Sequence, residues 1–184
     1  TKCSIKRWNR NRYSYASAII MNGCGNTASY NLISDGGQGI LCYGSNLTIE
    51  YNHFHNLMGE TDDAGAVYAG ANMSYFNVNV RNNLFTNIQT TLPGGYYYTN
   101  SRTPTGCVSS QNRGIAGLHG VYFDDSMSGC TVTNNIFYKV ASGEGAAVFT
   151  NGGVKHSITN NIFIDCNQGY ETSLQSKDFW NSTL

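Results

Sequence analysis

The chain of 184 residues has no formal net charge, with 11 basic and 11 acidic side chains, and only 12% of its residues are charged. Such a chain has no global field to attract nucleic acid or an anionic membrane surface, and it contains no run of 18 apolar residues to span a bilayer. Its length suits one domain with its own core, so we expect residues 1–184 to form a single domain. Neither an initiator Met nor a signal peptide is present, and we expect a mature product or a fragment of a longer chain.

The composition favours an all-β fold with many bends. Gly occurs 21 times and Pro only twice, and Asn is abundant throughout. Gly and Asn tolerate the left-handed backbone region that tight bends require. Strong helix formers are scarce, and no long segment has a 3.6-residue apolar period. We therefore expect short strands separated by bends.

Taken from the N-terminus, residues 1–18 alternate like an incoming strand and turn, and five similar segments follow. Each has a short apolar run, a bend, an alternating strand and a closing Asn-x-Phe or related triplet; they span residues 19–33, 40–54, 67–85, 121–137 and 148–163. The closing triplets begin at Asn31, Asn52, Asn83, Asn135 and Asn161. One interval between segments is twice as long as its neighbours, which indicates either a hidden coil or an insertion.

This repeat predicts a parallel β-helix, or β-solenoid, of about six to eight coils with one long loop insertion. Equivalent strands of successive coils would lie about 4.8 Å apart. The Asn residues would then stack as a hydrogen-bonded ladder at one bend, and the Phe or Ile two residues later would point into the core. An antiparallel sandwich of many short strands is the alternative.

Two segments break the repeat. We interpret residues 89–118 as a long loop that leaves the solenoid wall, a kind of loop that often carries function. Residues 170–184 lose the pattern, and Trp180 is a candidate to plug the end of the core. Open strand edges at the ends of the solenoid would permit end-to-end self-association.

The cysteines and glycosylation sequons indicate an extracellular protein. None of the six cysteines forms a C-x-x-C pair, and an even count suits disulfides in an oxidising compartment, although small Cys side chains also pack in cores as free thiols. Their pairing is left open. The sequons at Asn46, Asn72 and Asn181 predict glycosylation and secretion.

One outer face of the predicted solenoid carries aromatic rings. If Val121 points inward, strand alternation places Tyr122 and Asp124 outward. Equivalent positions in the other coils then make a stripe of Leu41, Tyr68, Tyr122 and Phe149. Aromatic rings beside polar groups suit sugar binding, while the same rings could instead form a small satellite core under the 89–118 loop.

The chain resembles the right-handed parallel β-helix proteins of the pectate-lyase-like superfamily. Among them it is most similar to secreted glycoside hydrolases of fucosidase and xylanase type. The matching stretches are Asn9-Arg-Asn-Arg-Tyr, Gly37-Gln-Gly-Ile-Leu, Ile49-Glu-Tyr-Asn-His-Phe-His-Asn, Asp63-Ala-Gly-Ala-Val-Tyr and Gly120-Val-Tyr-Phe-Asp-Asp. The resemblance implies a polysaccharide substrate and a catalytic role for Asp63 together with Asp124 or Asp125.

Glycosidic cleavage requires two carboxyl groups, about 5 Å apart for retention and about 6.5–9.5 Å apart for inversion. When Val67 is aligned with Val121, Asp63 stands four positions before the aligned valine and Asp124 three positions after it. Seven extended residues span about 23 Å, so only a bend near Asp63 would bring the two carboxyl groups together. Glu144 shares the register of Asp63 and is a reserve candidate. His119 lies beside the acids and could position a substrate hydroxyl. Ordinary turns and a calcium site are the alternative interpretations of these acids.

No cofactor or metal site is predicted. His53 and His55 share one strand face, but a third ligand is missing, and no Gly-rich phosphate loop opens a helix. We therefore expect a secreted carbohydrate-active protein that binds a polysaccharide. A glycoside hydrolase is favoured over a lyase, and a non-catalytic glycan-binding or self-assembling β-helix is the alternative.

Overall fold

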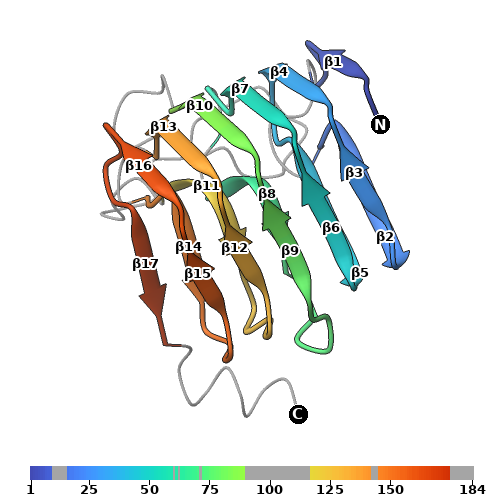
Figure 1. Cartoon of the computed structure of the whole chain (residues 1–184), viewed down its shortest axis with the longest axis vertical. Helices are drawn as coiled ribbons and strands as arrows, with labels where there is room; N and C mark the ends of the chain where they lie inside the picture. Colours follow the sequence, from blue (N-terminus) through green and yellow to red (C-terminus); the bar gives the residue numbers. More distant parts are fainter. Residues whose placement is uncertain are drawn as a thin grey trace, which may run out of the picture.

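The computed structural model describes residues 1–9, 16–59, 61, 63–70, 72–89, 117–141 and 145–174. In this part of the chain the regular structure consists of 17 strands, which form three sheets with parallel neighbours (Figure 1). The described residues contain no helix long and apolar enough to cross a membrane. Figure 1 shows successive coils stacked from the N-terminal to the C-terminal end.

The strands fall into three sheets, in each of which neighbouring strands come from successive coils. Sheet 1 consists of β1 (Ser4–Lys6), β4 (Leu32–Gly36), β7 (His53–Leu57), β10 (Leu84–Ile88), β13 (Ile136–Val140) and β16 (Ile162–Ile164). Sheet 2 consists of β2 (Ile19–Cys24), β5 (Ile40–Ser45), β8 (Ala64–Ala69), β11 (Leu118–Phe123), β14 (Val148–Asn151) and β17 (Tyr170–Ser173). Sheet 3 consists of β3 (Thr27–Ser29), β6 (Leu47–Glu50), β9 (Val78–Arg81), β12 (Thr131–Thr133) and β15 (Ser157–Thr159).

Each coil passes through sheet 3, sheet 1 and sheet 2 in turn, which confirms the predicted parallel β-helix. The strand register also confirms the alignment of the apolar runs, because the same position recurs at Ile19, Ile40, Val67, Val121 and Val148. β1 confirms the incoming strand. The repeat does not end at residue 170, however, because β17 pairs with β14 and continues sheet 2.

The doubled interval in the repeat is an insertion and not a hidden coil. β8 pairs directly with β11, with Val67 opposite Val121, so no further coil lies between these two strands. Most of the predicted loop, residues 90–116, lies outside the described residues, as does Trp180.

The core is built on a stack of rings from sheet 1. Phe54, Phe85, Phe137 and Phe163 occupy equivalent positions, and their centroids are 4.7, 4.6 and 5.2 Å apart from coil to coil. Ile33 takes the same position in the preceding coil. The predicted inward position of this residue is therefore confirmed. Coil spacing sets the ring separation, because parallel strands lie about 4.8 Å apart.

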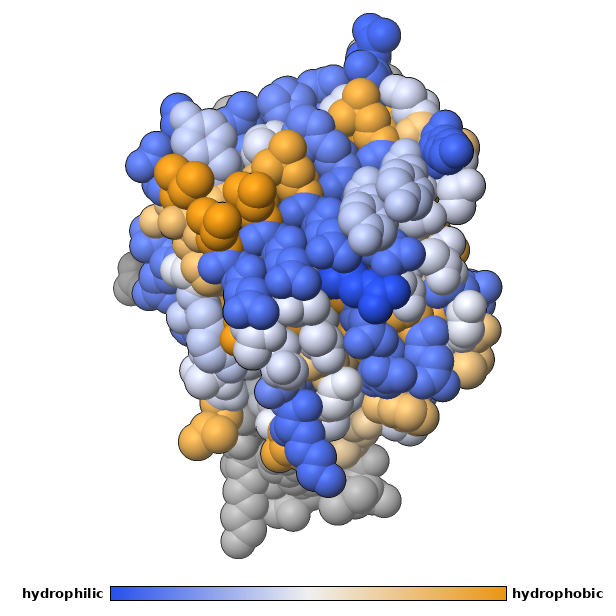
Figure 2. Space-filling view, in the orientation of Figure 1, coloured by the Kyte–Doolittle hydropathy of each residue, from blue (hydrophilic) through white to orange (hydrophobic). Residues whose placement is uncertain are grey.

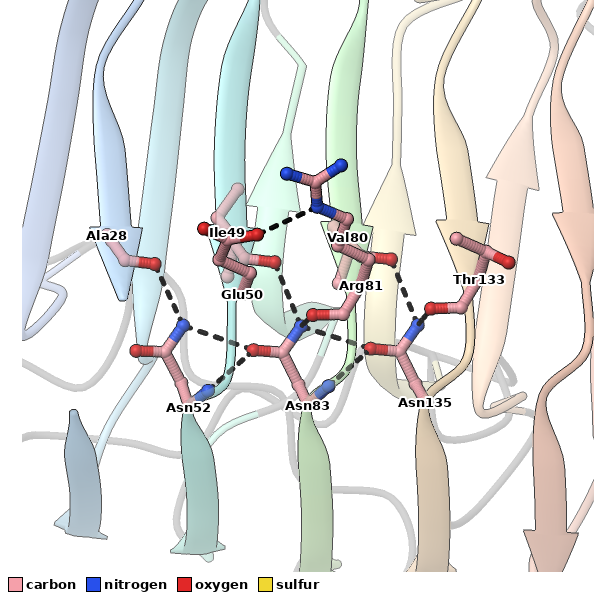
Figure 3. Close-up of polar contacts among 9 residues, drawn as sticks. All are labelled: Ala28, Ile49, Glu50, Asn52, Val80, Arg81, Asn83, Thr133 and Asn135. Atoms are coloured by element: carbon pink, nitrogen blue, oxygen red, sulfur yellow. Dashed lines mark hydrogen bonds and ion pairs between the residues drawn. The ribbon is translucent and has the colours of Figure 1, made fainter. Parts of the chain in front are cut away.

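The predicted Asn ladder lies at the bend between sheet 3 and sheet 1 (Figure 3). The side-chain oxygen of Asn83 accepts hydrogen bonds from the backbone N–H and the amide of Asn52, at 2.9 and 3.1 Å. Asn83 in turn donates its backbone N–H and its amide to Asn135, at 2.9 and 3.0 Å. Asn31 and Asn161 extend the same pattern. The ladder satisfies buried backbone donors that no strand partner reaches.

A residue in the left-handed backbone region stands next to the ladder at this bend in every described coil. These residues are Lys2, Tyr30, Tyr51, Asn82, Asn134 and Asn160. Asn is suited to this conformation because its short polar side chain bonds the local backbone. The high Asn content therefore follows from the number of bends.

The disulfide prediction is wrong for the described cysteines, which are all free thiols. Cys3 and Cys24 are exposed, Cys166 is half-buried, and Cys42 and Cys130 lie in the core. Burial raises the pKa of Cys130 to about 11 and raises the pKa of Cys42 further. These two side chains pack as small apolar groups. Cys107 lies outside the described residues.

Candidate functional site

The predicted stripe lies on the outer face of sheet 2. The register places Leu41, Tyr68, Tyr122 and Phe149 side by side on four neighbouring strands. They form a second hydrophobic cluster, separate from the main core. Only 4% of Tyr68 and 5% of Tyr122 is exposed, so these rings offer almost no surface to a sugar. Their burial favours a small satellite core over an open binding face, while most of the 89–118 loop lies outside the described residues.

Asp124 follows β11 and is held by three donors. Its Oδ2 accepts the Tyr68 hydroxyl at 2.8 Å. Its Oδ1 accepts the Asn151 amide and the backbone N–H of Asp125, each at 2.8 Å. An ionised carboxylate accepts about four hydrogen bonds, so this group is fixed in orientation and retains little free capacity.

His119 lies on the same outer face and packs between rings. Its imidazole stacks on Phe149 with centroids 4.6 Å apart and contacts Tyr122 at 4.8 Å. Burial lowers the pKa of His119 to about 4, against smaller opposing effects of Ala146 and Asp124. Nδ1 lies 3.1 Å from the backbone nitrogen of Ala146 and 3.2 Å from its carbonyl oxygen. Either tautomer of the neutral ring therefore finds a partner at Ala146, and the ring is neutral at physiological pH.

A glycine makes room for these rings. Gly65 of β8 pairs with His119, and a Cβ at Gly65 would lie 2.8 Å from the Cβ of Tyr122. No real Cβ tolerates that contact without a shift of its neighbours. The Gly of the Asp63-Ala-Gly motif is therefore required by packing.

The structure does not bring Asp63 next to Asp124. Asp63 precedes β8, whose first residue Ala64 pairs with Leu118, whereas Asp124 follows the other end of β11. In this register Asp63 and Asp124 stand seven residue positions apart along the strand direction, which is about 23 Å for extended strands. Asp125 lies beside Asp124 with a left-handed backbone. Glu144 lies outside the described residues.

Two of the predicted glycosylation sites are exposed at bends. Asn46 accepts the amide of Asn77 at 2.7 Å and donates its own amide to the Cys24 sulfur at 3.3 Å. Asn72 accepts both the N–H and the hydroxyl of Ser74, the third residue of its own sequon, at 2.9 and 2.7 Å. These bonds involve only the oxygen of Asn72, so its amide nitrogen is the better placed of the two for glycosylation. Asn181 lies outside the described residues.

A second candidate site runs along the bend between sheet 3 and sheet 1. It is a shallow groove of about 500 Å³, lined by Tyr30, Tyr51, Asn52, His53, Asn82, Asn83, Leu84, Asn134 and Ile136. Tyr30 and Tyr51 stack with centroids 4.9 Å apart and an interplanar angle of 8°. They are 54% and 47% exposed. The groove therefore has an accessible aromatic platform, which the outer face of sheet 2 lacks.

The rest of the groove combines apolar and polar groups. Figure 2 shows hydrophobic residues gathered towards the C-terminal coils of this face, where Ile136 and Ile162 are exposed. Polar residues occupy the bend itself. Asn82 and Asn134 donate their backbone N–H groups to Thr133 and Thr159, and no side-chain hydrogen bond of either amide occurs within the described residues. Those amides are available to a ligand.

A family model for the right-handed β-helix region matches residues 1–113, more than half of the chain. The chain belongs to the right-handed β-helix family. No curated protein and no solved structure matches it significantly. Membership in this family agrees with the three parallel sheets, and it does not by itself identify a reaction.

The tyrosines of this right-handed β-helix were missed in the sequence, although a signal was present. Tyr precedes the ladder Asn in two successive repeats, at Tyr30 and Tyr51, where later coils have Asn82 and Asn134. A bulky side chain in the left-handed region costs about 1–2 kcal/mol. The left-handed backbone belongs to the bend, because every described coil has it there, so what distinguishes these two coils is the large exposed ring.

Proposed function

We propose that this right-handed β-helix binds a polysaccharide in the bend groove, with Tyr30 and Tyr51 as the platform for its sugar rings. The observation that carries the proposal is the pair of exposed tyrosine rings, stacked with centroids 4.9 Å apart. The flat apolar face of a pyranose packs on aromatic rings, and a few polar groups fix its orientation. The amides of Asn82 and Asn134 supply those polar groups in the next two coils.

The lining of the groove favours an uncharged glycan. None of its nine lining residues is acidic, Lys or Arg. The nearby Arg81 is neutralised by Glu50, with Nε and Oε2 2.8 Å apart. A neutral chain laid along the solenoid axis would meet equivalent positions of successive coils about 4.8 Å apart.

The test is glycan binding by the Tyr30→Asn/Tyr51→Asn double variant. Asn fits the left-handed backbone, so the fold should be retained and the strain relieved, while the ring platform is lost. We expect polysaccharide affinity to fall at least about tenfold, in the range of about 1.4 kcal/mol or more. Tyr138→Thr is the matched control, because Tyr138 is an exposed tyrosine of sheet 1 that does not line the groove. Unchanged binding by the double variant would refute the proposal.

Hydrolysis at Asp124 is a second candidate function. The oriented carboxylate of Asp124, with Asp125 adjacent and the neutral imidazole of His119 on the same face, favours it. In this proposal Asp124 acts as base or nucleophile, and its acid partner must lie within about 5–9.5 Å. The predicted partner Asp63 does not meet that distance by strand geometry, so Asp125 is the better candidate.

Release of reducing ends from neutral plant and algal polysaccharides tests the hydrolase proposal. Asp124→Asn and Asp125→Asn should each abolish turnover while groove binding persists, and Asp63→Asn should retain it. A wild-type protein that binds the polysaccharide but releases no product would leave the binding function and exclude hydrolysis.

An extracellular setting accompanies this proposal. It now rests on the sequons, foremost Asn72, because the described cysteines are free. A mass decrease on enzymatic removal of N-glycans from the protein in its own host would support it. End-to-end association also stays a prediction. It is supported by the partial exposure of Phe163, the last stacked ring among the described residues, at 37%.

A further inference from the structure

Two histidines converge on one point of the outer face of sheet 1. His53 and His55 are two residues apart in β7, so both side chains project from the same face. His53 Nε2 lies 2.9 Å from the Thr86 hydroxyl, and His55 Nδ1 lies 2.8 Å from the same oxygen. Thr86 pairs with His55 on the neighbouring strand β10. The ring centroids are 5.5 Å apart.

The arrangement has an uneven hydrogen-bond balance. The Thr86 hydroxyl has one proton, which it can donate to one ring or to the Phe54 carbonyl oxygen 3.4 Å away, so at least one ring donates an N–H to the hydroxyl oxygen. A ring that donates there turns a lone pair to the shared position by a change of tautomer. Within the described residues neither ring forms a hydrogen bond at its other nitrogen, so this change breaks no contact.

This geometry resembles half of a metal coordination shell. Imidazole nitrogen is the protein ligand that suits Ni²⁺, Cu²⁺ and Zn²⁺, at about 2.0–2.1 Å for zinc. The two nitrogens lie 2.9 and 2.8 Å from the Thr86 oxygen. A cation bound to both nitrogens therefore requires the hydroxyl to rotate away and both rings, which are only partly buried, to move inward. The Asp35 carboxylate interacts electrostatically with His55, and it would offset part of the charge of a cation.

We propose that His53 and His55 bind a late first-row divalent cation between His53 Nε2 and His55 Nδ1, after rotation of the Thr86 hydroxyl that now lies there, with water completing the shell. Asp35 is not a ligand, because its oxygens accept the Ser34 hydroxyl and the Asn56 amide, each at 2.9 Å. The described residues contain no group of three His, Cys, Asp or Glu side chains that could together hold a metal ion. The site therefore offers two protein nitrogens and open positions, which suits an exchangeable ion more than a structural one.

The site stands independently of the proposed glycan function. His53 also lines the bend groove, but the coordination geometry arises from β7 and β10 alone. Its test therefore uses metal binding as the readout and requires no glycan.

The experiment is a Ni²⁺ titration by calorimetry on tag-free, full-length protein. The exposed thiols of Cys3 and Cys24 are first alkylated, because thiolates also bind these metals. We expect one equivalent bound, and His53→Ala or His55→Ala should each weaken binding by about tenfold or more. His156→Gln is the matched control and should bind like the wild type, because His156 lies outside sheet 1 and stacks on a core ring.

Electron paramagnetic resonance of the Cu²⁺-loaded protein gives a second readout that does not depend on variant stability. Nitrogen couplings from two imidazoles are expected in the wild type and from one in each single variant, with folding checked by circular dichroism. Equal Ni²⁺ binding by the wild type and the His53→Ala/His55→Ala double variant would overturn the proposal. Absence of binding by the wild type would do the same.

Discussion

Removal of one rung from the middle of the Asn ladder should destabilise the protein strongly. Asn83→Ala deletes five side-chain contacts: two from Asn52 to its oxygen, and three from its amide to the Ile49, Arg81 and Asn135 oxygens. The amide has only two protons, so these contacts amount to about four hydrogen bonds. At about 1 kcal/mol each, the free energy of unfolding should fall by about 4 kcal/mol.

Two further variants separate hydrogen bonding from lost volume. Asn83→Asp keeps the acceptor for Asn52 but turns an oxygen towards the three acceptors that the amide served. We expect it to be at least as destabilising as Asn83→Ala at pH 7, and to recover in part as acid protonates the new carboxyl. Asn161→Ala, at the half-buried end of the ladder, should cost about half as much, since water can replace its contacts.

Urea unfolding followed by circular dichroism measures these differences. The midpoint should fall most for the two Asn83 variants and least for Asn161→Ala. A loss of less than about 1 kcal/mol in Asn83→Ala would refute the ladder as a source of stability. Equal losses in the middle and at the end would refute the argument from burial.

Three further outcomes follow from the structure. Burial lowers the folded-state pKa of His119 to about 4, below the unfolded value of about 6.5. The contribution of neutral His119 to the free energy of unfolding is therefore fully present above pH 6.5 and is lost as pH falls to 4, about 3 kcal/mol in all. His119→Phe should flatten that part of a stability–pH curve. Phe85→Ala should cost about 3–5 kcal/mol in urea unfolding, and Phe163→Ala clearly less because that ring is 37% exposed. A thiol reagent should label Cys3 in the native protein but Cys42 only after unfolding.

Much of the fold was predictable because its signals are local and repeated. The Asn at one bend and the Phe two residues later recur in step, and each repeat can satisfy both only by stacking on its neighbours. The outward parity of Tyr122 followed from strand alternation in the same way. The disulfide prediction failed because a cysteine count carries no information about where each thiol lies in the stacked coils.

The candidate site was predictable only in part, because exposure and proximity are tertiary properties. The sequence by itself determined the parallel coil, the ladder and which side chains point outward, since these depend on residue order and a period of two. Only the tertiary structure decided that Tyr68 and Tyr122 are buried while Tyr30 and Tyr51 are open to solvent. It also decided that the two imidazoles of β7 meet at Thr86, because that contact depends on the register between two strands more than thirty residues apart.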